Sequence, residues 1–107
     1  MQSIQEEHGP KRTVLVDTEL CRLETEEYGG LISLHWPRLK WSPTYYKMYL
    51  KLFEEVKQYI WKKGYDKISL VFIKTKNDKR VKLAKMFGFE RAESINGHEV
   101  YELWLSQ

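Results

Sequence analysis

The 107-residue sequence lacks several features that would place a protein in a class at once. Its single cysteine, Cys21, excludes an internal disulfide and cannot build a zinc site alone, so we interpret it as a half-buried strand residue rather than a nucleophile. The chain has no apolar run of about 18 residues and no signal-peptide pattern. We therefore expect a soluble, cytoplasmic protein that holds no metal.

Hydrophobic residues make up 42% of the chain and charged residues 31%, an ordinary balance for a globular protein. The length predicts one domain. Residues 1–10 are polar and end in Gly9-Pro10, so we expect them to form a flexible tail and residues 11–107 to form the domain. Aromatic residues are frequent, at 14%, and such residues supply core packing or interface contacts.

Charge is divided unevenly along the chain. Residues 1–34 carry seven acids and three bases, and the last 22 residues are acidic again. Residues 57–85 carry ten bases against only Asp66 and Asp78. Solvated helix faces are the commoner explanation of such a block, and a surface for an anionic partner is the functional one.

Hydrophobic patterning predicts three strands in the first third, over residues 13–16, 20–25 and 31–36, joined by short turns. Residues 36–41 read as irregular. Ser42 and Pro43 then mark the start of a long helix, because serine caps an orphan N–H and proline has none to satisfy. Its apolar stripe follows helical spacing, and the helix ends at Gly64 after Lys62 and Lys63; the stripe consists of Tyr45, Tyr49, Leu52, Phe53, Val56 and Ile60.

The last third predicts one more helix and three more strands. Residues 68–73 are almost unbroken apolar residues, which favours a central strand covered on both faces. A second helix follows over residues 78–87, ended by Gly88. Strands at 89–95 and 98–105 form a hairpin around Asn96-Gly97. The order β-β-β-α-β-α-β-β indicates an α/β (α+β) fold with a mixed, mostly antiparallel sheet, a central parallel pair and two helices.

This order resembles the GNAT (GCN5-related N-acetyltransferase) superfamily over about residues 11–105. The segment Asn77-Asp-Lys-Arg-Val-Lys-Leu-Ala-Lys-Met-Phe-Gly-Phe89 matches the family's spacing at Asn77, Leu83, Gly88 and Phe89. The family's usual first strand and following helices have no counterpart here. The chain is also similar to small GNAT-like proteins of tailed bacteriophages, including an internal virion protein, which implies a phage-type or host-interaction role with possible virion association.

Departures from the family pattern matter more than the matches. The family's CoA pyrophosphate lies in a glycine-rich loop before the long helix, but no glycine lies between Gly30 and Gly64. Counting back from Gly64 places that loop on Tyr45–Tyr49. The family's catalytic tyrosine corresponds to Ala84. Strand 31–36 has no glutamate, and His35, the one titratable group there, reads as an ordinary strand residue.

The sequence supports three hypotheses for the function of this chain. The first is a non-catalytic GNAT-fold binding protein, a pseudoenzyme, that contacts a protein or a second copy of itself through an aromatic and basic patch: Trp36, Arg38, Lys40, Trp41, Tyr45, Tyr46 and Lys47. It needs no cofactor, and no residue is assigned a catalytic role. The second is an N-acetyltransferase with an atypical acetyl-CoA site, in which Asn77 would meet the cofactor. The third is nucleic-acid binding through the lysine-rich block. The sequence leaves open whether Trp36 and Trp41 face the core or the surface.

Overall fold

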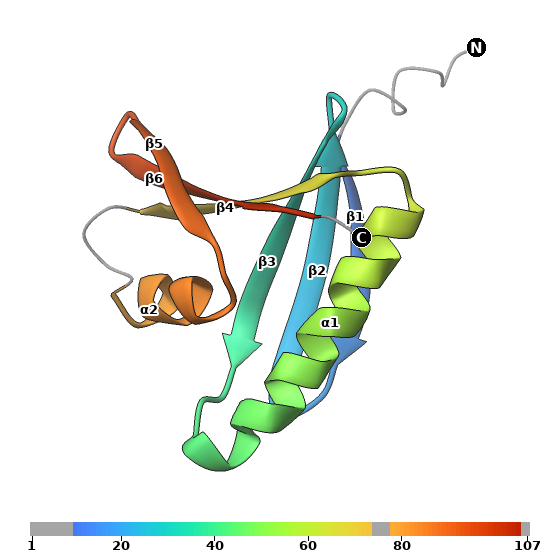
Figure 1. The fold of residues 1–107 in the computed structure, drawn as a ribbon, viewed down its shortest axis with the longest axis vertical. Coiled ribbons are helices and arrows are strands. Elements are labelled where there is room, and N and C mark those ends of the chain that lie inside the picture. The colour runs from blue at the N-terminus through green and yellow to red at the C-terminus, as the bar shows by residue number, and fades with distance from the viewer. Residues whose placement is uncertain (1–9, 74–77, 106–107) are drawn as a thin grey trace.

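The computed structural model describes residues 10–73 and 78–105 and has the predicted α+β fold, with one sheet of six strands and two α-helices (Figure 1). The strand order in the sheet is β1-β2-β3-β4-β6-β5. The expected flexible tail lies outside the described residues, apart from Pro10. The elements are β1 (Lys11–Asp17), β2 (Cys21–Tyr28), β3 (Leu31–Leu39), a 3-10 turn (Pro43–Tyr45), α1 (Tyr46–Lys62), β4 (Lys67–Ile73), α2 (Asp78–Met86), β5 (Glu90–Ile95) and β6 (His98–Trp104).

The sheet is antiparallel except at its centre, as predicted. β3 and β4 are parallel, because α1 returns the chain to the end of the sheet at which β3 began. Their register contains one pair, Ser33 with Ser69, after which the two strands separate. β4 instead pairs with β6 along its whole length. The sheet therefore opens between β3 and β4, and this opening positions the site described below.

The core lies between one face of the sheet and the two helices. α1 buries Tyr49, Phe53, Val56 and Ile60, which confirms the predicted stripe. Ser42 caps the 3-10 turn ahead of α1, where its Oγ accepts a hydrogen bond from the Thr44 N–H at 3.2 Å. After Lys63, Gly64 adopts a φ of 99°, which favours glycine and ends the helix.

α2 adds a second set of apolar side chains to the same core. Leu83, Ala84 and Phe87 are buried there. The Phe87 ring stacks on Phe53 of α1 with a centroid separation of 4.7 Å. Burial of large apolar side chains at about 1.5–3 kcal/mol each makes this shared core the main source of stability.

The prediction that residues 36–41 are irregular is wrong for the first four of them. β3 continues to Leu39 and keeps pairing with β2, through Arg38 with Arg22 and Leu39 with Cys21. A β-bulge makes this possible, because two residues of β3, Trp36 and Pro37, stand opposite one residue of β2. Proline lacks an N–H, and a bulge is a place in a strand where the missing donor is tolerated.

The prediction that residues 68–73 are covered on both faces is also wrong. Ile68 and Leu70 are buried under the helices, whereas Val71 is 53% exposed. Both helices contribute to one core, so the described residues leave the opposite face of β4 open. The apolar run of β4 thus does not reflect burial on both sides.

The predicted β5–β6 hairpin is confirmed. Asn96 and Gly97 have φ values of 49° and 80°, so both turn residues are left-handed, as a two-residue turn of this kind requires. Asparagine tolerates this conformation and glycine adopts it freely, which is why the pair predicted the turn.

Glu27 links β2 to the end of α1. Its carboxylate accepts a hydrogen bond from the Tyr65 hydroxyl at 2.8 Å and lies 3.4 Å from the Lys63 ammonium nitrogen. The side chain is only 15% exposed. The Tyr65 hydrogen bond, assisted by Lys63, lowers the pKa of Glu27 although burial opposes this shift.

We expect Glu27→Gln to lower the free energy of unfolding by about 1–3 kcal/mol at neutral pH, because a charged hydrogen bond is lost at a mostly buried site. A lowered folded-state pKa stabilises the fold above the unfolded-state value and loses this contribution as pH falls through the folded-state value. Urea denaturation at several pH values should therefore show the difference between variant and wild type shrinking in acid. Glu55→Gln, at an exposed position on α1, is the control and should change little. An unchanged difference in acid would contradict the role of the charge.

Candidate functional site

A groove with a volume of about 610 Å³ lies between the carboxyl-terminal half of β3 and α2. Its position follows from the separation of β3 and β4 after Ser33 and Ser69, with α2 beside the opening (Figure 1). One wall comes from β3 and the residues that follow it, and the other from α2. The lining residues are Trp36, Leu39, Trp41, Lys79, Arg80, Lys82, Leu83 and Met86.

The groove combines an apolar floor with a cationic wall. Trp36 and Leu83 are buried and form part of the floor, while Trp41 and Met86 are 43% and 46% exposed. Lys79, Arg80 and Lys82 are exposed on α2. None of the eight described residues that line the groove is a carboxylate, histidine, cysteine or tyrosine. The side chains present can hold an anionic ligand with an apolar part.

Aromatic rings hold Trp41 at the edge of this groove. Trp41 stacks on Tyr49 with a centroid separation of 6.1 Å and contacts Tyr46 edge-on at 5.9 Å. Tyr45 contacts Tyr49 in the same way at 6.2 Å. The Tyr49 hydroxyl donates a hydrogen bond to the Lys40 carbonyl at 2.6 Å, and burial raises its pKa. Tyr49 thus fixes the segment between β3 and α1, and Trp41 rests on it.

The predicted patch residues do not all gather at one place. Trp36 is 4% exposed and packs edge-on against Phe87 at 6.4 Å, so it belongs to the core and only borders the groove. The bulge at Trp36 and Pro37 interrupts the alternation of β3, so Arg38 stands opposite Arg22 on the other face, where it contacts the Asp17 carboxylate and donates to the Thr18 carbonyl. Trp36 and Trp41, whose orientation the sequence left open, therefore differ: one is core and the other is surface.

The other four predicted patch residues lie around the first turn of α1. Lys40 and Lys47 are exposed, and Tyr45 and Tyr46 are half-buried. Tyr46 and Lys47 begin α1 itself, so the segment counted as a counterpart of the CoA loop is mostly helical. Tyr46 reaches the groove indirectly, through its contact with Trp41.

Sequence reasoning missed the α2 side of the groove. Lys79, Arg80 and Lys82 were assigned to a basic block, but not to the same site as Trp41. Their clustering on one short helix is visible in the sequence, but their distance from Trp41 along the chain conceals that they line the same groove. Only the parallel pairing of β3 with β4 brings the start of α2 beside the end of β3.

His35 has polar neighbours on the open face of the sheet. Its Nε2 lies 3.2 Å from the Ser33 hydroxyl oxygen and 3.4 Å from Glu26 Oε1. A serine–histidine–acid relay needs the two contacts on different ring nitrogens, and here both fall on Nε2. This arrangement does not activate Ser33 as a nucleophile.

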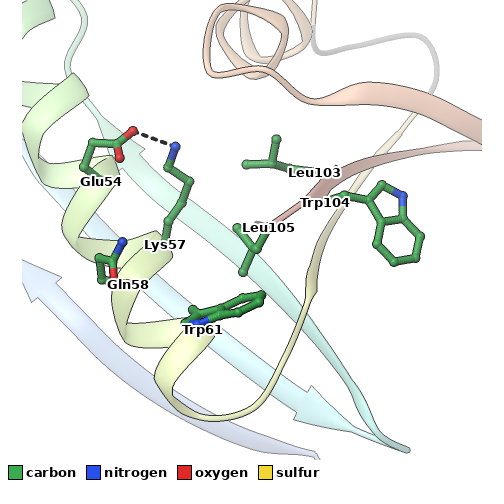
Figure 2. A pocket seen from close by; sticks show the side chains of 7 residues that line it. All are labelled: Glu54, Lys57, Gln58, Trp61, Leu103, Trp104 and Leu105. Carbon is green, nitrogen blue, oxygen red and sulfur yellow. Dashed lines mark ion pairs between the residues drawn. The ribbon is translucent and has the colours of Figure 1, made fainter. Parts of the chain in front are cut away.

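A second, smaller pocket of about 130 Å³ lies between α1 and the end of β6 (Figure 2). The Lys57 ammonium pairs with the Glu54 carboxylate at 2.6 Å, so the charges on its α1 side compensate each other. Figure 2 shows the Trp104 indole directed away from Trp61 and Lys57. We consider this pocket too small and too neutral to be the main site.

The remaining predictions from the sequence concern cofactors, metals and membranes. Ala84, which the resemblance matched to a catalytic tyrosine, is completely buried in α2, and Asn77 lies outside the described residues. Within residues 10–73 and 78–105, no three His, Cys, Asp or Glu side chains gather into a group that could hold a metal ion. In the same residues, no helix has the length and apolar character needed to cross a membrane.

Comparison with known proteins adds no family assignment. No protein-family model matches this chain, and no curated protein matches it either.

Proposed function

We propose that this chain is a non-catalytic, GNAT-like binding protein of the cytoplasm that holds a partner protein in the groove between β3 and α2. The observation that carries the proposal is the lining of the groove. It joins an exposed tryptophan and an apolar floor to three cationic side chains, and its described lining residues include no carboxylate, histidine, cysteine or tyrosine.

The lining selects the chemistry of the partner. Lys79, Arg80 and Lys82 would pair with carboxylates, and Trp41, Leu39 and Met86 would receive an apolar side chain. Tryptophan at the rim of a pocket is a residue type that contributes strongly to binding energy. An acidic segment with one or two large apolar side chains therefore fits this groove best.

An acetyl-CoA-dependent transferase is the second candidate, favoured by the presence of an open groove beside β3. Two features weigh against it. The rings of Trp41, Tyr45, Tyr46 and Tyr49 pack together where the long helix starts. Ala84 cannot protonate a leaving thiolate. Nucleic-acid binding ranks third, because glutamates of β2 and β6 would oppose a phosphate backbone that extended beyond the groove.

Selection from a random peptide library on the immobilised protein tests the proposal. We expect enriched peptides to combine Asp or Glu with a large apolar residue, and to lose binding to a Lys79→Glu, Arg80→Glu variant. Trp104→Ala, which removes a different exposed tryptophan, is the matched control and should retain binding.

Two results would contradict the proposal. One is enrichment of peptides without acidic residues, or peptide binding that the Lys79→Glu, Arg80→Glu variant does not weaken. The other is a large thermal shift with acetyl-CoA, since a ligand at one hundred times its dissociation constant adds about 2.7 kcal/mol of stability.

A further inference from the structure

The face of the sheet opposite the helices carries a row of exposed side chains across four strands. Tyr28 of β2 stands opposite Leu31 of β3, and Lys67 of β4 stands opposite Trp104 of β6. Ser33 of β3 pairs with Ser69 of β4, and Leu31 and Lys67 each lie two residues before these serines. Tyr28, Leu31, Lys67 and Trp104 therefore project from the same face of the sheet. Tyr28, Leu31 and Trp104 are 61%, 59% and 64% exposed.

The row is continuous because Lys67 bridges its two apolar ends. Its ammonium lies 5.1 Å from the centre of the Trp104 ring and 3.0 Å from the Glu102 carboxylate. The charge of Lys67 is thus compensated within the sheet, and the strand order places Lys67 between Leu31 of β3 and Trp104 of β6. Scattered exposed apolar residues are normal on a surface, but an aligned row of this kind indicates contact with another molecule.

On the same face of the sheet, next to this row, lies a shallow depression of about 360 Å³ with an acidic rim. Leu31, Val71 and Val100 line it together with the glutamates Glu26, Glu93 and Glu102, and Lys67 is the one cation among its lining residues. Arg12, at the margin, is shared between Glu24 and Glu26 at 2.8 and 3.4 Å. Three lining glutamates thus face two cations, Lys67 and Arg12, so the depression keeps a net negative charge although Glu26 and Glu102 are each paired.

The row also lies over the parallel strands β3 and β4, where an uncovered face is unusual. Parallel strands are usually covered on both faces, yet β3 and β4 have helices on one face among the described residues. Four strands spaced about 4.8 Å apart span about 15 Å. A helix of about ten residues, rising 1.5 Å per residue, is long enough to cross this width.

We propose that this open face docks a basic amphipathic helix of a partner protein. The apolar stripe of that helix would lie on Tyr28, Leu31 and Trp104, and its lysines or arginines would face Glu26, Glu93 and Glu102. A second copy of this chain, face to face, would bring the same glutamates together, so like charges disfavour it. The site is separate from the β3–α2 groove and goes beyond the function proposed for it.

Two synthetic helical peptides of about 15 residues test the proposal, both with a leucine stripe and one with lysine, the other with glutamate, on the polar face. We expect the lysine peptide to bind by calorimetry at least about tenfold more tightly than the glutamate peptide. Amide shifts in two-dimensional NMR spectra should fall on residues 28–31 and 67–71. Leu31→Lys and Glu93→Lys should each weaken binding, with no loss of fold because both positions are exposed.

Trp41→Ala and Lys79→Glu should leave the affinity for the lysine peptide unchanged, which separates this surface from the groove. Equal binding of both peptides, or binding that Leu31→Lys does not weaken, would overturn the proposal. So would self-association of the protein alone that Leu31→Lys abolishes, because the face would then belong to a second copy. NMR shifts confined to α2 would also overturn it.

Discussion

Replacement of Trp36 by alanine is expected to lower the free energy of unfolding by about 3–5 kcal/mol. The ring is 4% exposed and joins β3 to Phe87 at the end of α2. Removing it leaves a cavity at the point where the sheet opens, and neighbouring β-strands cannot collapse freely into that space. The free energy of unfolding of a domain of this size is about 5–15 kcal/mol in total, so this substitution removes a large fraction of the stability. Urea denaturation followed by circular dichroism measures it.

Trp104→Ala provides the matched comparison, because it removes the same side chain from a position that is 64% exposed. Its effect should remain within about 0.5 kcal/mol. If Trp36→Ala prevents folding, Trp36→Phe should still show a smaller loss of stability. Equal small effects at both positions would mean that Trp36 is not a core residue.

Replacement of Trp41 and Tyr46 together by alanine is expected to weaken binding of a groove-selected acidic peptide by about 30-fold or more. This corresponds to a hot spot of about 2 kcal/mol. Trp41 borders the groove and Tyr46 supports its ring. The stability cost should be smaller than this, because Trp41 is already 43% exposed and Tyr46 is half-buried, so neither truncation opens a closed cavity in the core. Fluorescence anisotropy and urea denaturation of the same samples compare the two effects.

Met48→Ala is the control for this pair, since Met48 is 44% exposed in the first turn of the same helix and does not line the groove. It should change neither quantity appreciably. A double variant that loses stability but retains affinity for the peptide would show that the aromatic cluster is structural only.

Local signals predicted the elements well because each rests on the chemistry of nearby residues. Ser42-Pro43, Gly64 and Asn96-Gly97 act within a few residues of themselves, and the structure confirms all three. Pro37 misled the prediction of β3, since the bulge that accommodates it depends on Leu23 of the neighbouring strand. No pattern within β3 alone reveals that partner.

The candidate site was predicted less well than the fold. Trp41 is at the surface as the patch required, but Trp36 is buried and Arg38 lies on the other face of β3. The cations that complete the groove come from α2, about 40 residues further along the chain. A patch defined by neighbours in sequence cannot include residues that only the sheet brings together.

Taken by itself, the order of amino acids determined most of the helices and strands and where the chain turns, because hydrophobic period and turn chemistry are local properties. The crossover through α1 further indicated that the central pair is parallel. Tertiary structure alone decided which face of each strand is covered, that β3 and β4 separate after one pair, and that Trp41 lines the same groove as the cations of α2. These outcomes depend on how distant segments share one limited core, and the free energy of that packing cannot be assigned to any single segment.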